Sequence, residues 1–163
     1  MTIRFLRVAT AVLGVSLTTL ALAQLAPAQP DLHGFPGSVP RHNFAQTFGI
    51  PARYASMRNP LPDVERTWWR GASVYAQKCA SCHGQAGEGN GPGGRLLGTP
   101  PANLAWFATL PMSRWDGFMY WTIAEGGQPF GTAMPAYKKT LTDRDIWAVT
   151  AYIRQTLGKT RRS

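Results

Sequence analysis

The sequence predicts an all-α protein. Three segments repeat apolar residues at intervals of three and four positions, which is the spacing of one helix face. No segment shows the alternation of apolar and polar residues that is typical of a half-buried strand. The three expected helices lie within residues 63–158, and a proline-rich stretch, residues 24–62, precedes them. We therefore expect one small helical domain with an N-terminal extension.

The first expected helix covers residues 63–78, with Asp63 as its N-cap. Its apolar face consists of Val64, Trp68, Gly71 and Tyr75 and leads into Cys79. A loop rich in glycine and proline, residues 84–103, follows it and shows no period.

The second expected helix opens where Ser113 is followed by Asp116, a capping pattern, and ends after Glu125 at two glycines. Its apolar stripe consists of Trp115, Met119, Tyr120 and Ile123. The third opens at Thr142 with Asp145 three positions later, and Gly158 ends it. Its buried face consists of Ile146, Val149, Tyr152 and Ile153.

Residues 1–23 have the pattern of an export signal. Arg4 and Arg7 precede an apolar run, residues 8–22, and Ala-Leu-Ala at residues 21–23 is a small-x-small cleavage site. The run is short against the ~20 residues that span a bilayer, so we expect cleavage rather than an uncleaved membrane anchor. The mature protein is then periplasmic, in an oxidising compartment.

Residues 24–62, the arm, hold seven of the thirteen prolines and show no helical or strand period. We expect an extended or loosely packed segment without a core of its own. Its aromatic residues, which include Phe44, Phe48 and Tyr54, are too many for a passive linker. Either the arm wraps over the domain or it docks on a partner, and the sequence leaves both open. At the other end the chain closes with a basic tail, residues 159–163.

The segment Cys79-Ala80-Ser81-Cys82-His83 reads C-x-x-C-H, the attachment signature of a c-type haem. Two thiols three positions apart can each add to one vinyl group of the porphyrin. The histidine that follows then lies under the iron as the proximal ligand. We predict one covalent haem c, with Cys79 and Cys82 as attachment sites and His83 as an axial ligand.

Three other uses of these cysteines are less favourable. A redox-active C-x-x-C normally lies at a helix N-terminus in a βαβ unit, whereas the residues before Cys79 are predicted to be helical. A zinc site needs four ligands, and the chain has no further cysteine. A structural disulfide across two residues has poor geometry.

A second axial ligand is expected at Met134. It lies 51 residues after His83, in the short loop Gly-Thr-Ala-Met-Pro-Ala-Tyr between the second and third helices. A proline directly after the methionine restricts the backbone there. A neutral thioether favours Fe(II) and raises the reduction potential relative to a bis-histidine site. The other candidates are Met57, Met112, Met119, His33 and His42, with His42 as the leading alternative.

The remaining pocket residues are predicted from simple needs of the cofactor. The second nitrogen of His83 should donate to a carbonyl that orients the ring, and we assign that carbonyl to Pro92. Trp121 and Arg95 are expected to contact the haem propionates. Aromatic residues that could form apolar walls are Trp106, Phe107, Trp115, Trp121 and Phe130.

From residue 67 to residue 157 the chain resembles a class I cytochrome c domain of the small bacterial, monohaem kind. Gly71 and Tyr75 match the glycine and aromatic of the first helix in that family. The stretch around Tyr152 matches its last helix, and residues 123–135 match its run to the methionine ligand. The resemblance implies the cytochrome c fold: three main helices around a covalently attached haem, with the first and last helices crossing closely. The arm is a departure from the minimal domain.

Two protein ligands on the iron leave one-electron transfer as the expected function, such as that of a carrier in a respiratory chain. The formal net charge of +9 falls to +7 when the signal is removed, because that segment holds two arginines and no acidic residue. We therefore expect redox protein partners with acidic docking surfaces, or a membrane complex, and neither nucleic acid nor a small-molecule substrate. Lys78, Lys138 and Lys139 are candidate docking charges.

Two further functions remain open at this point. The chain could be a fixed cytochrome subunit of a larger periplasmic or membrane-bound oxidoreductase. It could also be a peroxidase or gas-binding protein with an open iron position.

Overall fold

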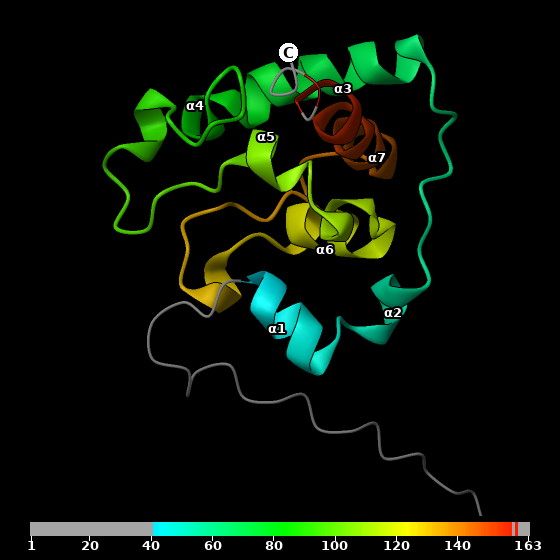
Figure 1. The fold of residues 1–163 in the computed structure, drawn as a ribbon, viewed down its shortest axis with the longest axis horizontal. Helices are drawn as coiled ribbons and strands as arrows, with labels where there is room; N and C mark the ends of the chain where they lie inside the picture. Colours follow the sequence, from blue (N-terminus) through cyan, green and yellow to red (C-terminus); the bar gives the residue numbers. More distant parts are fainter. Residues whose placement is uncertain (1–40, 158, 160–163) are drawn as a thin grey trace, which may run out of the picture. The chain divides into compact units, whose positions relative to one another are not determined.

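The computed structural model describes residues 41–157 and 159. Within these residues all regular structure is helical and no strand occurs, which confirms the predicted fold class (Figure 1). The predicted signal segment, the first part of the arm (24–40), Gly158 and residues 160–163 lie outside them. The α-helices in chain order are α1 (Arg41–Phe48), α2 (Ala52–Ala55), α3 (Glu65–Lys78), α4 (Ala80–His83), α5 (Leu104–Phe107), α6 (Asp116–Glu125) and α7 (Asp143–Tyr152).

Shorter helical turns complete the described chain. Three are 3-10 turns, at Pro92–Gly94, Pro111–Arg114 and Gln128–Phe130, and a π-helical turn, Ile153–Leu157, continues α7. Among the described helices none is long and apolar enough to cross a membrane.

Helices α3 and α7 cross in close contact at Gly71, as the family resemblance implied (Figure 1). A Cβ atom placed on Gly71 would lie 2.6 Å from the Cβ of Tyr152, so no larger residue fits without a shift of the helices. One turn further along α3, the rings of Tyr75 and Tyr152 pack with centroids 5.4 Å apart. The predicted crossing and its aromatic pair are therefore confirmed.

The capping prediction is correct for α7 and wrong for the other two helices. Thr142 and Asp145 form a reciprocal capping box at the start of α7. The residue before α3 is Val64, whose side chain makes no capping bond, and Asp63 instead accepts hydrogen bonds from Trp68 and from Gln155. Both donors are long side chains that reach Asp63 from α3 and from the π-helical turn after α7, so the carboxylate joins two elements rather than capping one.

Ser113 does not cap α6 either. It lies buried in the preceding 3-10 turn, and its hydroxyl donates to the carbonyl of Leu110 at 2.7 Å. The buried face of α3 also differs from the expected one, because Thr67 is buried while Val64 is 43% exposed. The Thr67 hydroxyl donates to the carbonyl of Pro62, which satisfies its polar group on the buried side.

Helix α6 is buried on all its faces, not only on the predicted stripe. Met119, Tyr120 and Ile123 are buried as expected, but Gly117, Phe118 and Trp121 are buried as well. A helix that is apolar all round must be covered on every side. Here α7 lies against one side and the arm against another (Figure 1).

The described part of the arm, residues 41–62, contains two helices, which corrects the prediction of an extended segment. Its prolines fall between the helices: Pro51 precedes α2, and neither α1 nor α2 contains a proline. Proline breaks a helix only where it lies inside that helix. The high number of prolines in the whole arm therefore gave no indication of the short helices between them. Tyr54 of α2 is buried against α6, and Phe44 of α1 packs against Trp121.

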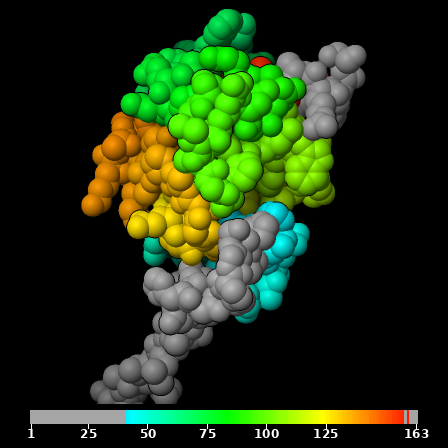
Figure 2. Space-filling view, turned by 90° about the vertical axis from the view of Figure 1, so that its left-hand side faces the viewer, coloured from blue at the N-terminus to red at the C-terminus, as the bar shows by residue number. Residues whose placement is uncertain are grey.

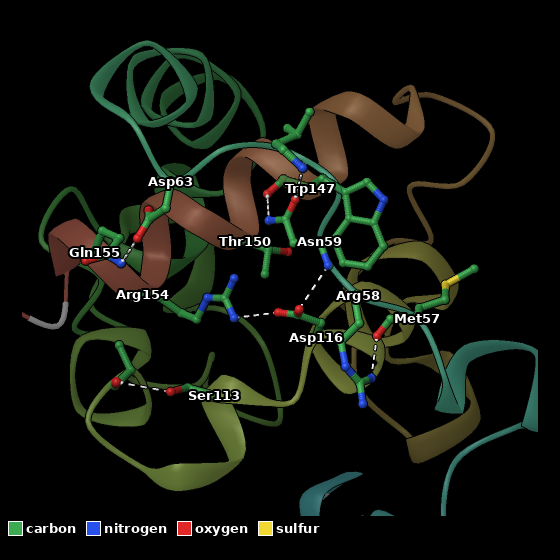
Figure 3. A network of polar contacts seen from close by, with 12 residues as sticks. Met57, Arg58, Asn59, Asp63, Ser113, Asp116, Trp147, Thr150, Arg154 and Gln155 are labelled. Atoms are coloured by element: carbon green, nitrogen blue, oxygen red, sulfur yellow. Dashed lines mark hydrogen bonds and ion pairs between the residues drawn. The ribbon is translucent and has the colours of Figure 1, made fainter.

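The segment between α2 and α3 is fixed to the domain by polar contacts (Figure 3). The side-chain amide of Asn59 donates to the carbonyl of Trp147 at 3.0 Å, and its backbone N–H donates to Asp116 at 2.9 Å. Asp116 also pairs with Arg154 at 2.5 Å. The described arm therefore wraps the domain, which is one of the two arrangements that the sequence left open.

Candidate functional site

The C-x-x-C-H segment forms a helical turn that continues α3. The carbonyl of Cys79 accepts hydrogen bonds from the backbone N–H groups of Cys82 and His83, at 3.1 and 2.9 Å. The hydroxyl of Tyr75 donates to the carbonyl of Gly84 at 2.8 Å, so the aromatic pair at the α3/α7 crossing also holds the end of this turn. The two thiols and the imidazole thus lie next to the close crossing of α3 and α7.

Both cysteines are free and half-buried. Burial, together with the nearby Cys82, raises the pKa of the Cys79 thiol to about 12. A redox-active C-x-x-C needs the opposite, a thiol whose pKa is lowered so that the nucleophilic thiolate is present. The raised pKa of Cys79 does not meet this requirement.

The ring of His83 is oriented by a carbonyl, but it is not that of Pro92. Nδ1 of His83 lies 2.9 Å from the carbonyl oxygen of Ala102. This contact is a hydrogen bond when Nδ1 carries the proton, which leaves Nε2 for a metal. The carbonyl of Pro92 accepts instead from the backbone N–H of Arg95, so the assignment to Pro92 was wrong. Burial lowers the pKa of His83, and the hydrogen bond to Ala102 offsets only part of this effect. The lowered pKa favours the neutral imidazole, which is the form that can bind a metal.

Ala102 reaches this position because the 84–103 loop folds back on itself. The carbonyl of Gly87 accepts hydrogen bonds from the N–H groups of Leu104 and Ala105, at 2.6 and 3.1 Å. These bonds bring the start of α5 next to the turn that follows His83. Nineteen residues separate His83 from its partner, and nothing in the local sequence pattern marks Ala102.

Met134 is half-buried against the core in a loop closed by its own backbone. Its carbonyl accepts from the N–H of Gly127 at 2.8 Å. After the methionine, the N–H groups of Tyr137 and Lys138 donate to the carbonyls of Ile123 and Ala124, both at 3.1 Å. The loop therefore returns to the end of α6, from which it started.

The loop of Met134 and the haem attachment turn meet in the structure. The hydroxyl of Tyr137 donates to the carbonyl of Lys78, the residue before Cys79, at 2.7 Å. Figure 2 shows the green segment that follows His83 beside the yellow and orange segment that carries Met134, on one face of the molecule. The structure thus brings together the two segments that hold the predicted axial ligands.

The other candidate ligands are placed differently. Met119 is only 4% exposed inside α6, as predicted for a core residue. Met57 and Met112 are half-buried against the core, and His42 is exposed on α1. His33 lies outside the described residues.

Comparison with known proteins identifies the chain. The family model described as "Cytochrome C oxidase, cbb3-type, subunit III" matches residues 66–153, more than half of the sequence. The chain belongs to this family. The resemblance to a class I c-type cytochrome domain is therefore confirmed, and membership of this family implies haem c as the cofactor class.

A solved structure also matches the cytochrome. It is that of the Kuenenia stuttgartiensis reducing HAO-like protein complex Kustc0457/Kustc0458, with 26% sequence identity and a TM-score of 0.49. The match covers 70% of this chain and 54% of that one, so the cytochrome spans about half the length of the matched chain.

The donor set of the cytochrome fits a haem c. Two free thiols lie one helical turn apart, followed by an imidazole whose Nδ1 is held by a carbonyl, and a thioether lies in the neighbouring loop. These are the groups that thioether attachment and His/Met ligation require. Cys79, Cys82, His83 and Met134 are the residues that would hold the group.

The predicted propionate contacts and apolar walls stay predictions. Arg95 and Pro92 are exposed in the 84–103 loop. Trp121 and Phe130 are buried, at 5% and 8% exposure, and pack beneath the arm against Phe44. Phe107 and Trp115 are half-buried around Phe118, and Trp106 is 51% exposed.

Proposed function

We propose that this cytochrome carries single electrons between redox protein partners outside the cytoplasmic membrane. One haem c is attached through Cys79 and Cys82 and ligated by His83 and Met134. The observation that carries the proposal is the attachment turn. Its two thiols are followed directly by an imidazole whose Nδ1 is engaged by Ala102 and whose Nε2 has no hydrogen-bond partner among the described residues. When bound, the haem supplies a one-electron couple at its iron.

The residues of the chain then have distinct tasks. The thiols fix the cofactor to the end of α3, and the Ala102 carbonyl keeps the imidazole in one orientation and one tautomer. Met134 would supply the second protein ligand to the iron, and its neutral thioether would favour the reduced state. The tyrosine pair at the α3/α7 crossing holds this arrangement rigid, and a rigid site needs little reorganisation when its charge changes.

The proposed partners are proteins with acidic docking surfaces. Lys78 and Lys139 are exposed next to the attachment turn and the methionine loop. Lys138, the third predicted docking charge, is paired with Glu125 at 2.6 Å and so contributes less free positive charge. Charge-steered contact suits a carrier that must bind and leave quickly.

A second candidate function is a fixed cytochrome subunit of a larger oxidoreductase. The observation that favours it is the family description, which names a subunit of an oxidase. Purification from native membranes and periplasm separates the two candidates: a free carrier elutes alone, whereas a fixed subunit elutes with its catalytic partner after mild solubilisation.

The site itself is tested by the mass and the spectrum of the full-length protein after export. Acid-acetone should fail to extract the haem, and the intact mass should exceed that of the apoprotein by one haem. Met134→Ala should abolish the weak near-infrared sulfur-to-iron band and admit CO. Met112→Ala is the control, because it also removes a half-buried methionine, and it should keep the band.

Each outcome of this test has a clear meaning. An extractable haem contradicts attachment through the two cysteines. A band that persists in Met134→Ala assigns the sixth position to another residue. Immediate CO binding by the unaltered protein supports an open-iron protein, and electron transfer through a His/Met site would then be wrong.

A further inference from the structure

The arm lies against the end of α6 from which the methionine loop departs. Arg41 of α1 donates a hydrogen bond to the carbonyl of Gly126, the first residue after the helix. Its guanidinium lies 4.2 Å from the ring centre of Trp121 and 4.3 Å from that of Phe130. One of its nitrogens, Nη1, is buried without a hydrogen-bond partner among the described residues. The two aromatic faces therefore compensate part of the cost of burying this cation.

Glu125, the last residue of α6, joins the arm to the far end of the methionine loop. One carboxylate oxygen accepts hydrogen bonds from the Tyr54 hydroxyl and from Arg53, the latter at 2.9 Å. The other oxygen accepts from Nζ of Lys138 at 2.6 Å. Tyr54 and Arg53 belong to α2, whereas Lys138 follows Met134 by four positions. One carboxylate thus bridges two distant segments of the chain, since Tyr54 and Lys138 are 84 positions apart.

The contacts of this cluster differ in strength. Arg53 and Lys138 have side chains 66% and 46% exposed, so each of their ion pairs is weak on its own. Tyr54 is 6% exposed and Arg41 is half-buried, and hydrogen bonds to a charged or buried partner are stronger. Most of the stabilisation should therefore come from Tyr54 and Arg41, which are less exposed than Arg53 and Lys138.

Movement at the end of α6 would be transmitted to Met134, because the loop packs closely against the residues that follow the helix. A Cβ atom on Gly126 would lie 2.5 Å from backbone atoms of Pro135 and Ala136. A Cβ atom on Gly127 would lie 3.1 Å from that of Met134. The Gly126–Gly127 turn and the loop segment around Met134 are in direct contact, so an opening of one displaces the other.

We propose that Arg41, Tyr54 and Glu125 form a clasp by which the arm holds the Met134 loop closed on the haem. They are positioning residues, and they act on the sixth position through the loop. The inference rests on the proposed function, since it requires Met134 to be the ligand. Its consequence is that the arm sets how readily an external ligand displaces the methionine.

The test measures the affinity of imidazole for the ferric, full-length holoprotein by spectrophotometric titration. Imidazole can bind only when the methionine has left, so its apparent dissociation constant falls as the open fraction rises. Tyr54→Phe removes one hydroxyl and keeps the ring. We expect it to tighten imidazole binding about tenfold, the effect of losing a hydrogen bond to a charged group. Glu125→Gln should act in the same direction.

Tyr120→Phe is the matched control. Tyr120 is 7% exposed, its ring packs against that of Tyr54, and its hydroxyl donates to the carboxylate of Asp143 at 2.5 Å. Asp143 begins α7 and does not belong to the methionine loop. Tyr120→Phe should therefore destabilise the fold to a similar extent but leave the affinity for imidazole within about twofold of the unaltered protein.

The outcomes separate this inference from the proposed function. Tighter imidazole binding in Tyr54→Phe but not in Tyr120→Phe supports the clasp. Equal changes in both tyrosine variants, or no change in Tyr54→Phe while Met134→Ala binds imidazole more tightly, overturn the clasp and leave the methionine ligand in place. If Met134→Ala itself binds imidazole no more tightly than the unaltered protein, Met134 is not the displaced ligand, and both the ligation and the clasp are wrong.

Discussion

The hydroxyl of Tyr137 donates a hydrogen bond to the carbonyl of Lys78 at 2.7 Å. This bond joins the loop of one predicted axial ligand to the last residue of α3, immediately before the first haem-attachment cysteine. Burial raises the pKa of Tyr137 to about 12, with smaller effects of Cys79 and Cys82, so the hydroxyl keeps its proton and can donate. The two sides of the proposed haem site are thus connected through protein atoms alone.

Tyr137→Phe tests this connection. It removes the bond but keeps the ring, and should lower the free energy of unfolding by about 1 kcal/mol, the usual worth of one hydrogen bond. Urea denaturation of the holoprotein measures the change. Tyr152→Phe is the control, because the described structure gives its hydroxyl no hydrogen-bond partner, and it should have little effect. Equal unfolding free energies for Tyr137→Phe and the unaltered protein would contradict the role of this bond.

Gly71→Leu should destabilise the fold by about 1–3 kcal/mol, because overpacking forces well-packed neighbours apart. The new side chain would collide with Ala148 and Tyr152 of α7. Ala76→Leu, an exposed position on the same helix, provides the control. Thermal unfolding measures both variants. A melting temperature of Gly71→Leu equal to that of the control would count against the close crossing of α3 and α7.

Acid should weaken the contacts of Glu125. Burial raises the pKa of this carboxyl, but hydrogen bonds from Lys138, Tyr54 and Arg53 outweigh it and lower the pKa to about 2, from its usual value of 4.5. A folded-state pKa below the unfolded one stabilises the fold above about pH 4.5, and this contribution is lost as the pH falls towards 2. The unaltered protein should therefore exceed Glu125→Gln in stability at pH 6, and the gap should shrink by pH 3. A gap that stays constant between these pH values, measured by urea denaturation, would show that ionised Glu125 contributes nothing.

Deletion of residues 24–62 should destabilise the cytochrome by more than about 3 kcal/mol, because it exposes the outer face of α6. Deletion of residues 24–40 alone removes none of the described contacts and serves as the control. Chemical denaturation and limited proteolysis compare the two. If the larger deletion keeps the spectrum, the unfolding free energy and the rate of electron exchange with native partners, the arm is only a tether.

Features encoded in short spacings along the chain could be predicted from the sequence. C-x-x-C-H places two thiols and an imidazole within a single helical turn, and the Thr142/Asp145 capping box is complete within four residues. Helical periodicity predicted buried positions of α7 such as Ile146 and Val149, because side chains three and four positions apart share one face. These features depend only on neighbours along the chain, and so they can be recognised before the fold is known.

Contacts between groups that are distant along the chain depend on the three-dimensional fold and could not be predicted. The carbonyl that orients His83 comes from Ala102 and not from Pro92. Every residue carries the same carbonyl group, so the residue type gives no indication of the partner. The path of the 84–103 loop determines which carbonyl lies next to the ring. The helices of the arm were missed for a related reason. Segments as short as α1 and α2 are marginal on their own and are stabilised by packing against α6. From the sequence, Glu125 is recognisable only as the last residue of a predicted helix. It joins the arm to the methionine loop because folding brings α2 and Lys138 to the same carboxylate.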